Sequence, residues 1–312
     1  MSSQVLQGLS TLFSPTRKIP SRDYVPLAQR DYGFTERFVT IRGRRICYVD
    51  EGTGPTILFL HGLGANIRRW QATLQEFAKF FRVIAYDHPG FGKSEKPNCA
   101  YNMAFFAETL RDFVRQLGLN NFHLIGHSLG GAVALDYLLK TSHAPVRSVI
   151  LVAPAGIRPR HPIWQRGLAA LLLRNCWGAR LMPRLVGASV YSPNELTDEM
   201  VSLAASVTAD PEWPKLRRAT VRTALAILGY CVREELRNVQ VPLGIIWGEQ
   251  DSLQPVQLAL EMHQKVPRAR LSVIPDCGHF PMLERPDEFH KVLRSFLTGQ
   301  GIPYEGCEGH WH

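Results

Sequence analysis

A serine between two glycines, with an acid and a histidine far downstream, has the composition of a nucleophilic catalytic site. Residues 126–130 read Gly-His-Ser-Leu-Gly and fit the pattern G-x-S-x-G. Asp251 and His279 follow in the order serine, acid, histidine. A serine hydroxyl is a weak nucleophile unless a histidine takes its proton and an acid orients that histidine. We therefore predict that Ser128, Asp251 and His279 form a catalytic triad.

The surroundings of Ser128 strengthen a pattern that is weak by itself. A chain with 25 glycines would contain G-x-S-x-G by chance about once in ten. Here an apolar run at 122–125 predicts a strand just before the pattern, and 129–140 predicts a helix just after it. A sharp strand–serine–helix turn exposes the hydroxyl and leaves no room for side chains beside it. The structural alternative is a serine that only caps the helix.

The acid and the base each follow a predicted parallel strand. The carboxyl ends of such strands border the crevice of an open α/β sheet, so Asp251 and His279 are expected to meet there. Glu249 is the alternative acid, two residues closer to its strand. Asp276 is too near His279 in sequence to approach the imidazole easily from the opposite side. The stretch after Val152 offers no carboxylate.

Strand and helix patterns alternate along most of the chain. The alternation predicts an α/β fold, a mostly parallel and doubly wound sheet with helices on both faces. It breaks at Pro154, and no strand pattern returns until residue 243, which predicts a helical cap inserted after the sixth strand. We expect strands at 34–41, 44–50, 56–60, 82–86, 122–125, 148–152, 243–247 and 270–274, and helices at 66–80, 106–117, 129–140, 256–265 and 287–297.

These patterns divide the chain into five parts. We expect an N-terminal arm at 1–33, a first part of the core at 34–156, the helical cap at 157–238, a second part of the core at 239–299, and a frayed tail at 300–312.

The overall composition excludes several classes of protein. Hydrophobic residues make up 45% of the 312 residues and charged residues 20%, which is typical of a globular chain. The 36 basic and 27 acidic residues give a net charge of +9, but no nucleic-acid-binding signature accompanies it. The segment 92–94 (Gly-Lys-Ser) imitates the end of a P-loop, yet Asp87 stands where that motif needs glycine. Neither a nicotinamide motif nor a zinc motif is present, so we expect no cofactor and no metal.

Five sequence blocks together identify a family resemblance. The chain resembles the α/β-hydrolase-fold serine hydrolases, of the esterase and lipase kind with a helical cap. The blocks are HGLG at 61–64, DHPGFGKS at 87–94, GHSLGG at 126–131, WGEQD at 247–251 and GHFPMLERP at 278–286.

This resemblance implies further roles at matching positions. The backbone N–H groups of Leu63 and Leu129 would form the oxyanion hole, whose donors each contribute about 10²- to 10³-fold to kcat. His61 and His127 are expected to brace loops through hydrogen bonds rather than to act as bases. The HGGG variant of many lipases is absent.

The arginine-rich start of the cap has two interpretations. The first is a cap helix with its apolar face on the core and its arginines in water. The second is a segment that lies on an anionic membrane surface. We otherwise expect a cytoplasmic protein, peripheral to the membrane at most, because no signal-peptide pattern opens the chain. The six arginines between 156 and 186 are Arg158, Arg160, Arg166, Arg174, Arg180 and Arg184.

The expected reaction is cofactor-free hydrolysis of a carboxylic ester of a small apolar substrate through an acyl-enzyme. Two alternatives remain open at this stage. The same triad could hydrolyse a carbon–carbon or amide bond or act as a lyase, or the scaffold could be a non-catalytic ligand receptor. Ser128 excludes the reactions that need an aspartate nucleophile. The oligomeric state is not predicted.

Overall fold

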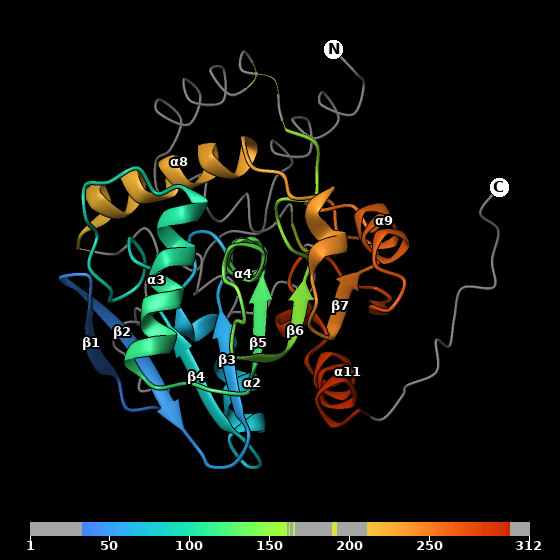
Figure 1. The fold of residues 1–312 in the computed structure, drawn as a ribbon, viewed down its shortest axis with the longest axis horizontal. Coiled ribbons are helices and arrows are strands. Elements are labelled where there is room, and N and C mark those ends of the chain that lie inside the picture. The colour runs from blue at the N-terminus through green and yellow to red at the C-terminus, as the bar shows by residue number, and fades with distance from the viewer. Residues whose placement is uncertain (1–32, 161, 163–164, 166–188, 192–210, 300–312) are drawn as a thin grey trace, which may run out of the picture.

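A computed structural model describes residues 33–160, 162, 165, 189–191 and 211–299 of the chain. Its centre is one sheet of eight strands (Figure 1). The strands are β1 (Arg37–Ile41), β2 (Arg44–Glu51), β3 (Thr56–Leu60), β4 (Arg82–Tyr86), β5 (Phe122–His127), β6 (Val146–Val152), β7 (Leu243–Gly248) and β8 (Arg270–Ile274).

The sheet is parallel except at one edge. Its spatial order is β1-β2-β4-β3-β5-β6-β7-β8, and only the β1–β2 and β2–β4 pairs are antiparallel. The central strands are largely apolar and almost every side chain in them is buried, as a sheet covered on both faces requires. Parallel strands end on the same side, so the loops after β3, β5, β7 and β8 emerge along one edge.

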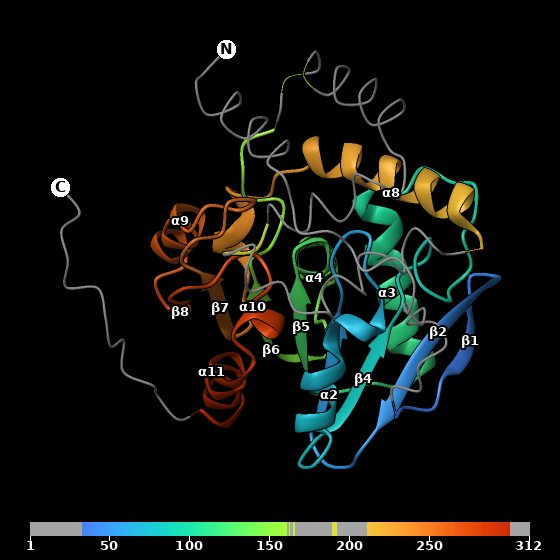
Figure 2. The ribbon, with the colours of Figure 1, turned by 180° about the vertical axis from the view of Figure 1, so that it is seen from behind.

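Helices cover both faces of the sheet and form two apolar cores. The described helices are α2 (Gln71–Phe77), α3 (Met103–Gln116), α4 (Leu129–Lys140), α8 (Trp213–Leu228), α9 (Gln257–Lys265), α10 (Pro281–Glu284) and α11 (Pro286–Thr298), with 3₁₀ turns η2 (Ile67–Trp70) and η4 (Glu235–Asn238). Helices α3 and α4, with α9 beside them, pack on one face, and α2 and α11 pack on the other (Figures 1 and 2). Helix α8 lies across the end of the molecule toward which the central strands point (Figure 1).

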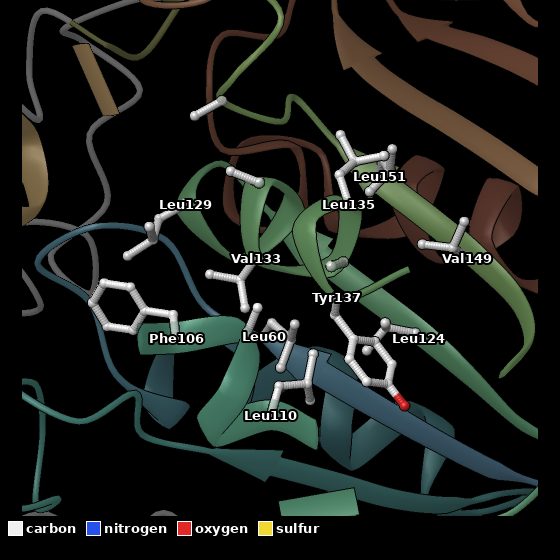
Figure 3. Close-up of a cluster of buried hydrophobic side chains, with 14 of the residues drawn as sticks. Leu60, Phe106, Leu110, Leu124, Leu129, Val133, Leu135, Tyr137, Val149 and Leu151 are labelled. Atoms are coloured by element: carbon white, nitrogen blue, oxygen red, sulfur yellow. The ribbon is translucent and has the colours of Figure 1, made fainter. Parts of the chain in front are cut away.

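The first core fixes the helix that follows Ser128. Val133 and Tyr137 of α4 pack against Leu60 of β3 and against α3, where Phe106 and Leu110 lie (Figure 3). All five side chains are almost fully buried. Because interiors are close-packed, this contact sets the position of α4, and with it the turn at its first residue, relative to the sheet.

The predicted fold class is confirmed, with local corrections. The strand expected at 34–41 begins only at Arg37. The helix expected at 66–80 consists of the 3₁₀ turn η2 followed by the short helix α2; 3₁₀ turns are frequent at the ends of α-helices. Helix α8 lies within the predicted cap. The arm, the tail and most of the cap's first half lie outside the described residues, so the five-part division remains a prediction.

Candidate active site

Ser128 occupies a strained turn between β5 and α4. Its backbone has φ 52° and ψ −111°, a conformation that side-chain-bearing residues rarely adopt. Three hydrogen bonds hold it there. The Ser128 N–H donates to the Val152 carbonyl at 3.0 Å, and the Ser128 carbonyl accepts from the N–H groups of Ala132 at 3.1 Å and Ala155 at 2.9 Å. This geometry matches a nucleophile elbow, in which strain presents the hydroxyl to a cavity.

The glycines on either side of the Ser128 turn, Gly126 and Gly130, allow it because each lies against the backbone of a neighbouring segment. A Cβ atom on Gly126 would lie 2.5 Å from the carbonyl oxygen of Gly130. A Cβ atom on Gly130 would lie 2.4 Å from the backbone oxygen of Leu60 in β3. Both contacts are with backbone, which cannot move aside. The glycines therefore let the start of α4 approach β3 and β5 closely.

Asp251 and His279 form a buried pair. The Oδ2 atom of Asp251 lies 2.7 Å from Nδ1 of His279, and both residues are under 5% exposed. The other carboxylate oxygen of Asp251, Oδ1, accepts from the backbone N–H groups of Leu253 at 2.9 Å and Gln254 at 2.7 Å. Nδ1 of His279 is thereby engaged by the acid, which leaves Nε2 as the ring nitrogen for proton transfer.

The two other acids considered from the sequence, Glu249 and Asp276, do not contact the His279 ring. The Oε2 atom of Glu249 accepts from the side-chain amide of Gln250 at 2.7 Å. Asp276 is exposed. Of the three carboxylates, only that of Asp251 contacts the His279 ring.

The loops that carry the acid and the base are packed backbone to backbone. The Gln250 N–H donates to the Cys277 carbonyl at 2.9 Å, and the Cys277 N–H donates to Oε1 of Gln250 at 3.0 Å. A Cβ atom on Gly248 would lie 2.0 Å from the carbonyl oxygen of Gly278. Only glycine at 248 permits this approach, which fixes the separation of Asp251 and His279.

Ser128 and His279 line one cavity of about 350 Å³, a size typical of small-molecule sites. Helix α8 forms one wall of it with residues at helical spacing, from Thr220 through Ala224 to Ile227 and Leu228. Helix α8 thus lies over the catalytic edge of the sheet, as the sequence predicted for a cap segment. The other described lining residues are Gly62, Leu63, Ala65, Arg69, His127, Ala155, Gly156, Arg158, Pro159, Ser189, Tyr230, Leu253, Gln254 and Phe280.

The sequence profile of the alpha/beta hydrolase fold matches residues 55–286, well over half of the chain. The chain belongs to the alpha/beta hydrolase family. The match spans Ser128, Asp251 and His279. The resemblance noted from five short blocks is therefore confirmed at the level of family and fold.

Similar proteins include more than one kind of hydrolase. A 2-hydroxy-6-oxo-6-(2'-aminophenyl)hexa-2,4-dienoic acid hydrolase of Metapseudomonas resinovorans is 27% identical over 275 residues, which cover 85% of this chain and 91% of the relative. A solved bacterial membrane phospholipase A is 27% identical, with a TM-score of 0.70 over 86% of this chain and 87% of the other. An esterase of Exiguobacterium antarcticum shares the fold, with a TM-score of 0.77 and 23% identity over 85% of this chain and 100% of the other.

The backbone N–H groups of Leu63 and Leu129 are the predicted donors of an oxyanion hole in this alpha/beta hydrolase. Leu129 is the first residue of α4, where N–H groups lack helical acceptors. Leu63 follows β3 and lines the cavity. Among the described residues, no acceptor pairs with the backbone N–H of Leu63 or with that of Leu129. The oxyanion role that the resemblance implies for these two residues remains a prediction.

His61 and His127 brace loops of the alpha/beta hydrolase scaffold. Nδ1 of His61 donates to the Gly62 carbonyl at 2.8 Å, and its Nε2 accepts the His88 N–H at 2.9 Å. Nε2 of His127 donates to the carbonyl of His279 at 2.8 Å. Burial lowers the pKa of His61 to about 4 and that of His127 well below its ordinary value. Both rings are therefore neutral and act as structural links.

Glu284 is a residue that the sequence reasoning missed. Its Oε2 atom accepts from the N–H groups of Gly278 at 2.9 Å and Tyr191 at 2.8 Å, and its Oε1 atom accepts from Phe280 at 2.8 Å. One carboxylate thus ties both neighbours of His279 to a segment from the cap. Glu284 lies within the GHFPMLERP block, but nothing in that block shows which of its residues holds the loop.

Two further observations concern the described residues only. They contain no group of three histidine, cysteine, aspartate or glutamate side chains placed to hold a metal ion. None of their helices is both long and apolar enough to span a bilayer.

Proposed function

We propose that this alpha/beta hydrolase cleaves a carboxylic ester of a largely apolar substrate through an acyl-enzyme on Ser128. The observation that carries the proposal is the buried Asp251–His279 pair, at 2.7 Å, of which His279 lines the same cavity as Ser128. Ser128, Asp251 and His279 follow three strands that end at one edge of the sheet, in the chain order expected of a triad on this fold, and this supports the proposed roles.

The proposed reaction has two halves. His279 Nε2 accepts the Ser128 proton while Oγ attacks the ester carbonyl, and Asp251 stabilises the imidazolium that forms. The N–H groups of Leu63 and Leu129 hold the oxyanion of the tetrahedral intermediate. The imidazolium then protonates the departing alcohol. A water molecule that loses its proton to His279 attacks the acyl-enzyme and releases the carboxylic acid.

The apolar part of the substrate is inferred from the described cavity wall. Ala224, Ile227 and Leu228 of α8 and the ring of Phe280 present hydrocarbon to the cavity. An acyl or alkyl chain would bury apolar surface there, at about 25 cal/mol per Å².

Hydrolysis of a carbon–carbon bond is the second candidate, and the relative named as a dienoic acid hydrolase favours it. The elbow of this chain, GHSLGG, resembles those of esterases and lipases more than the asparagine-containing elbow common in carbon–carbon hydrolases. We therefore place ester hydrolysis first. Turnover of a dienoate with no turnover of any ester would reverse this order.

Covalent labelling with a fluorophosphonate tests the nucleophile. We expect the probe to label wild-type protein on the peptide that contains Ser128. Ser128→Ala should fold normally, lose the label and lose nearly all hydrolysis of p-nitrophenyl esters of short to long acyl chains. Ser189, the other serine among the described residues that line the cavity, provides the control, and Ser189→Ala should still be labelled. A label on another peptide would refute the assignment, and an unlabelled wild-type protein without turnover would favour a receptor.

A further inference from the structure

The described wall of the catalytic cavity carries positive charge without acidic side chains. Two arginines, Arg69 and Arg158, line it, and no aspartate or glutamate does among the described lining residues. The remaining lining is mostly apolar or backbone. A purely apolar substrate gives no reason for the Arg158 guanidinium in the cavity wall, because transferring charge out of water is costly unless a partner compensates.

Arg158 is in the loop that follows β6. Its side chain is partly buried, and one Nη2 hydrogen bond goes to the carbonyl of Leu253 at 3.0 Å. No carboxylate of the described residues lies within 4.0 Å of it. Burial lowers the pKa of Arg158, while the nearby Asp251 raises it. A guanidinium remains charged under all ordinary conditions and has five N–H donors, so one backbone carbonyl leaves most of its donors for a ligand.

Arg69 approaches the cavity from the 3₁₀ turn η2, which follows β3. It is 6% exposed, and its guanidinium lies over the ring of Phe280, 4.7 Å from the ring centre. Its charge contributes to the lowered pKa values of His61 and His127, which places it close to the elbow. Arg69 thus lies on the side of the cavity near Ser128, and Arg158 lies on the side near Asp251.

We propose that the ester substrate is amphipathic and carries an anionic group, a carboxylate or a phosphate, that Arg158 binds with the help of Arg69. This inference rests on the proposed ester hydrolysis and adds the charge of the substrate to it. The guanidinium fork matches the two oxygens of a carboxylate or phosphate. The apolar residues of α8 receive the hydrocarbon part of the same molecule.

A set of matched esters tests the proposal. The 4-nitrophenyl monoester of adipic acid has a terminal carboxylate, and 4-nitrophenyl 6-methylheptanoate replaces that carboxylate with a neutral isopropyl group of the same shape. The 4-nitrophenyl ester of 5-phosphonopentanoic acid provides the phosphate-like anion. Wild-type protein should hydrolyse at least one anionic ester with a higher kcat/KM than the neutral ester. The anion with the higher value identifies carboxylate or phosphate as the preferred group.

Variants that remove single charges test whether Arg158 causes the preference for anionic esters. Arg158→Gln should lower the anionic-to-neutral ratio of kcat/KM by about 10- to 100-fold, the range expected for loss of a charge-assisted hydrogen bond. Arg158→Lys should restore part of the ratio. Arg160→Gln is the matched control, because Arg160 is exposed in the same loop and does not line the cavity. It should leave the ratio unchanged.

Two results would overturn the proposal. One is a wild-type protein that prefers the neutral ester. The other is an Arg160→Gln effect as large as that of Arg158→Gln, which would mean general attraction to a basic surface rather than a site.

A binding measurement separates this proposal from the proposed reaction. Calorimetric titration of Ser128→Ala protein with the same three esters needs no turnover. Suppose that Ser128→Ala protein binds an anionic ester preferentially, that adding Arg158→Gln abolishes this preference, and that wild-type protein hydrolyses none of the three esters. That result would support the anion site and refute ester hydrolysis. Hydrolysis of all three esters with equal efficiency would support the reaction and refute the anion site.

Discussion

At the scale of single residues, Asp251 uses its two carboxylate oxygens for different tasks. Oδ1 accepts from the Leu253 and Gln254 N–H groups, which holds the carboxylate in place. Oδ2 faces Nδ1 of His279. Because both tasks require acceptor oxygens, an amide cannot perform both. The structure therefore provides a physical reason for an acid at this position.

We expect Asp251→Asn to lower kcat by about 10³- to 10⁴-fold. The asparagine oxygen would keep the two backbone hydrogen bonds, so its NH₂ group would face Nδ1 of His279. That contact favours the tautomer with the proton on Nε2, which cannot accept the proton of Ser128. Steady-state kinetics on a p-nitrophenyl ester measure the effect. Glu249→Gln is the control and should change kcat little, and the reverse ranking would move the acid to Glu249.

His61 links the active-site loops to the pH dependence of stability. Burial lowers its pKa to about 4 in the folded protein, whereas an exposed histidine titrates near 6.5. Below pH 6.5 the unfolded chain binds a proton that the folded chain rejects. The free energy of unfolding should therefore fall as the pH drops from 6.5 toward 4, by about 1.4 kcal/mol per pH unit at most from this residue.

Urea unfolding at pH 7.5, 6.0 and 5.0 measures this dependence. His61→Gln should reduce the loss of stability between pH 7.5 and 5.0, because glutamine keeps a donor and an acceptor but does not titrate. His88 and His127 also have lowered pKa values, so part of the loss should remain. His143→Gln, at an exposed position, should not alter the profile. An unchanged slope in His61→Gln would contradict the assignment.

At the scale of elements, the site depends on how three loops are held against one another. The loops after β7 and β8 approach through Gly248, and the loop after β8 is tied to the segment 189–191. Glu284 at the end of α10 accepts hydrogen bonds from both neighbours of His279 and from Tyr191. Its side chain contacts the backbone of these loops, so its role is to position His279.

We expect Glu284→Gln to destabilise the protein by about 2 kcal/mol, the scale of hydrogen bonds to a charged group. The glutamine NH₂ would face an N–H donor that it cannot satisfy. Urea unfolding measures the stability, and the rate of fluorophosphonate labelling of Ser128 measures how well His279 is positioned. The stability and the labelling rate should both fall. In ester hydrolysis, kcat should fall by a larger factor than KM rises. Glu288→Gln, exposed on α11, should change neither, and an equal effect there would count against a positioning role.

At the scale of the whole molecule, the net charge of +9 bears on where the protein works. Most of the apolar and arginine-rich start of the cap, including Arg166 and Arg174, lies outside the described residues. If it lies on a membrane, each arginine contributes about 1 kcal/mol at an anionic surface. Salt screens that attraction over about 8 Å at physiological ionic strength.

Sedimentation with phosphatidylglycerol vesicles decides between the two interpretations of this segment. The membrane interpretation predicts binding at low salt that requires anionic lipid and weakens toward physiological salt. It also predicts a loss of binding in the Arg166→Gln, Arg174→Gln double variant. The double variant Arg37→Gln, Arg147→Gln removes the same charge from exposed positions of the core and should still bind. Protein that stays in the supernatant at low salt would support a cap that faces water.

The sequence by itself determined the order of strands and helices, the family, and the candidate residues Ser128 and His279. These features rest on local patterns, because apolar periodicity, glycine spacing and the motif order are readable within a few neighbouring residues. The ends of elements are less readable from such patterns. Apolar spacing at 66–80 predicts one helix, and because 3₁₀ and α turns share much of that spacing, it did not locate where η2 ends and α2 begins.

Only the tertiary structure decided which carboxylate faces His279, how Glu284 holds the loop, and that Arg69 and Arg158 share one cavity. Glu249 and Asp251 differ by two positions in one loop, and the turn of that loop directs one toward the ring and the other away from it. Arg69 and Arg158 are 89 positions apart (158 − 69). They share a cavity because parallel strands β3 and β6 end at the same edge of the sheet, so the closeness of their side chains is a property of the folded chain.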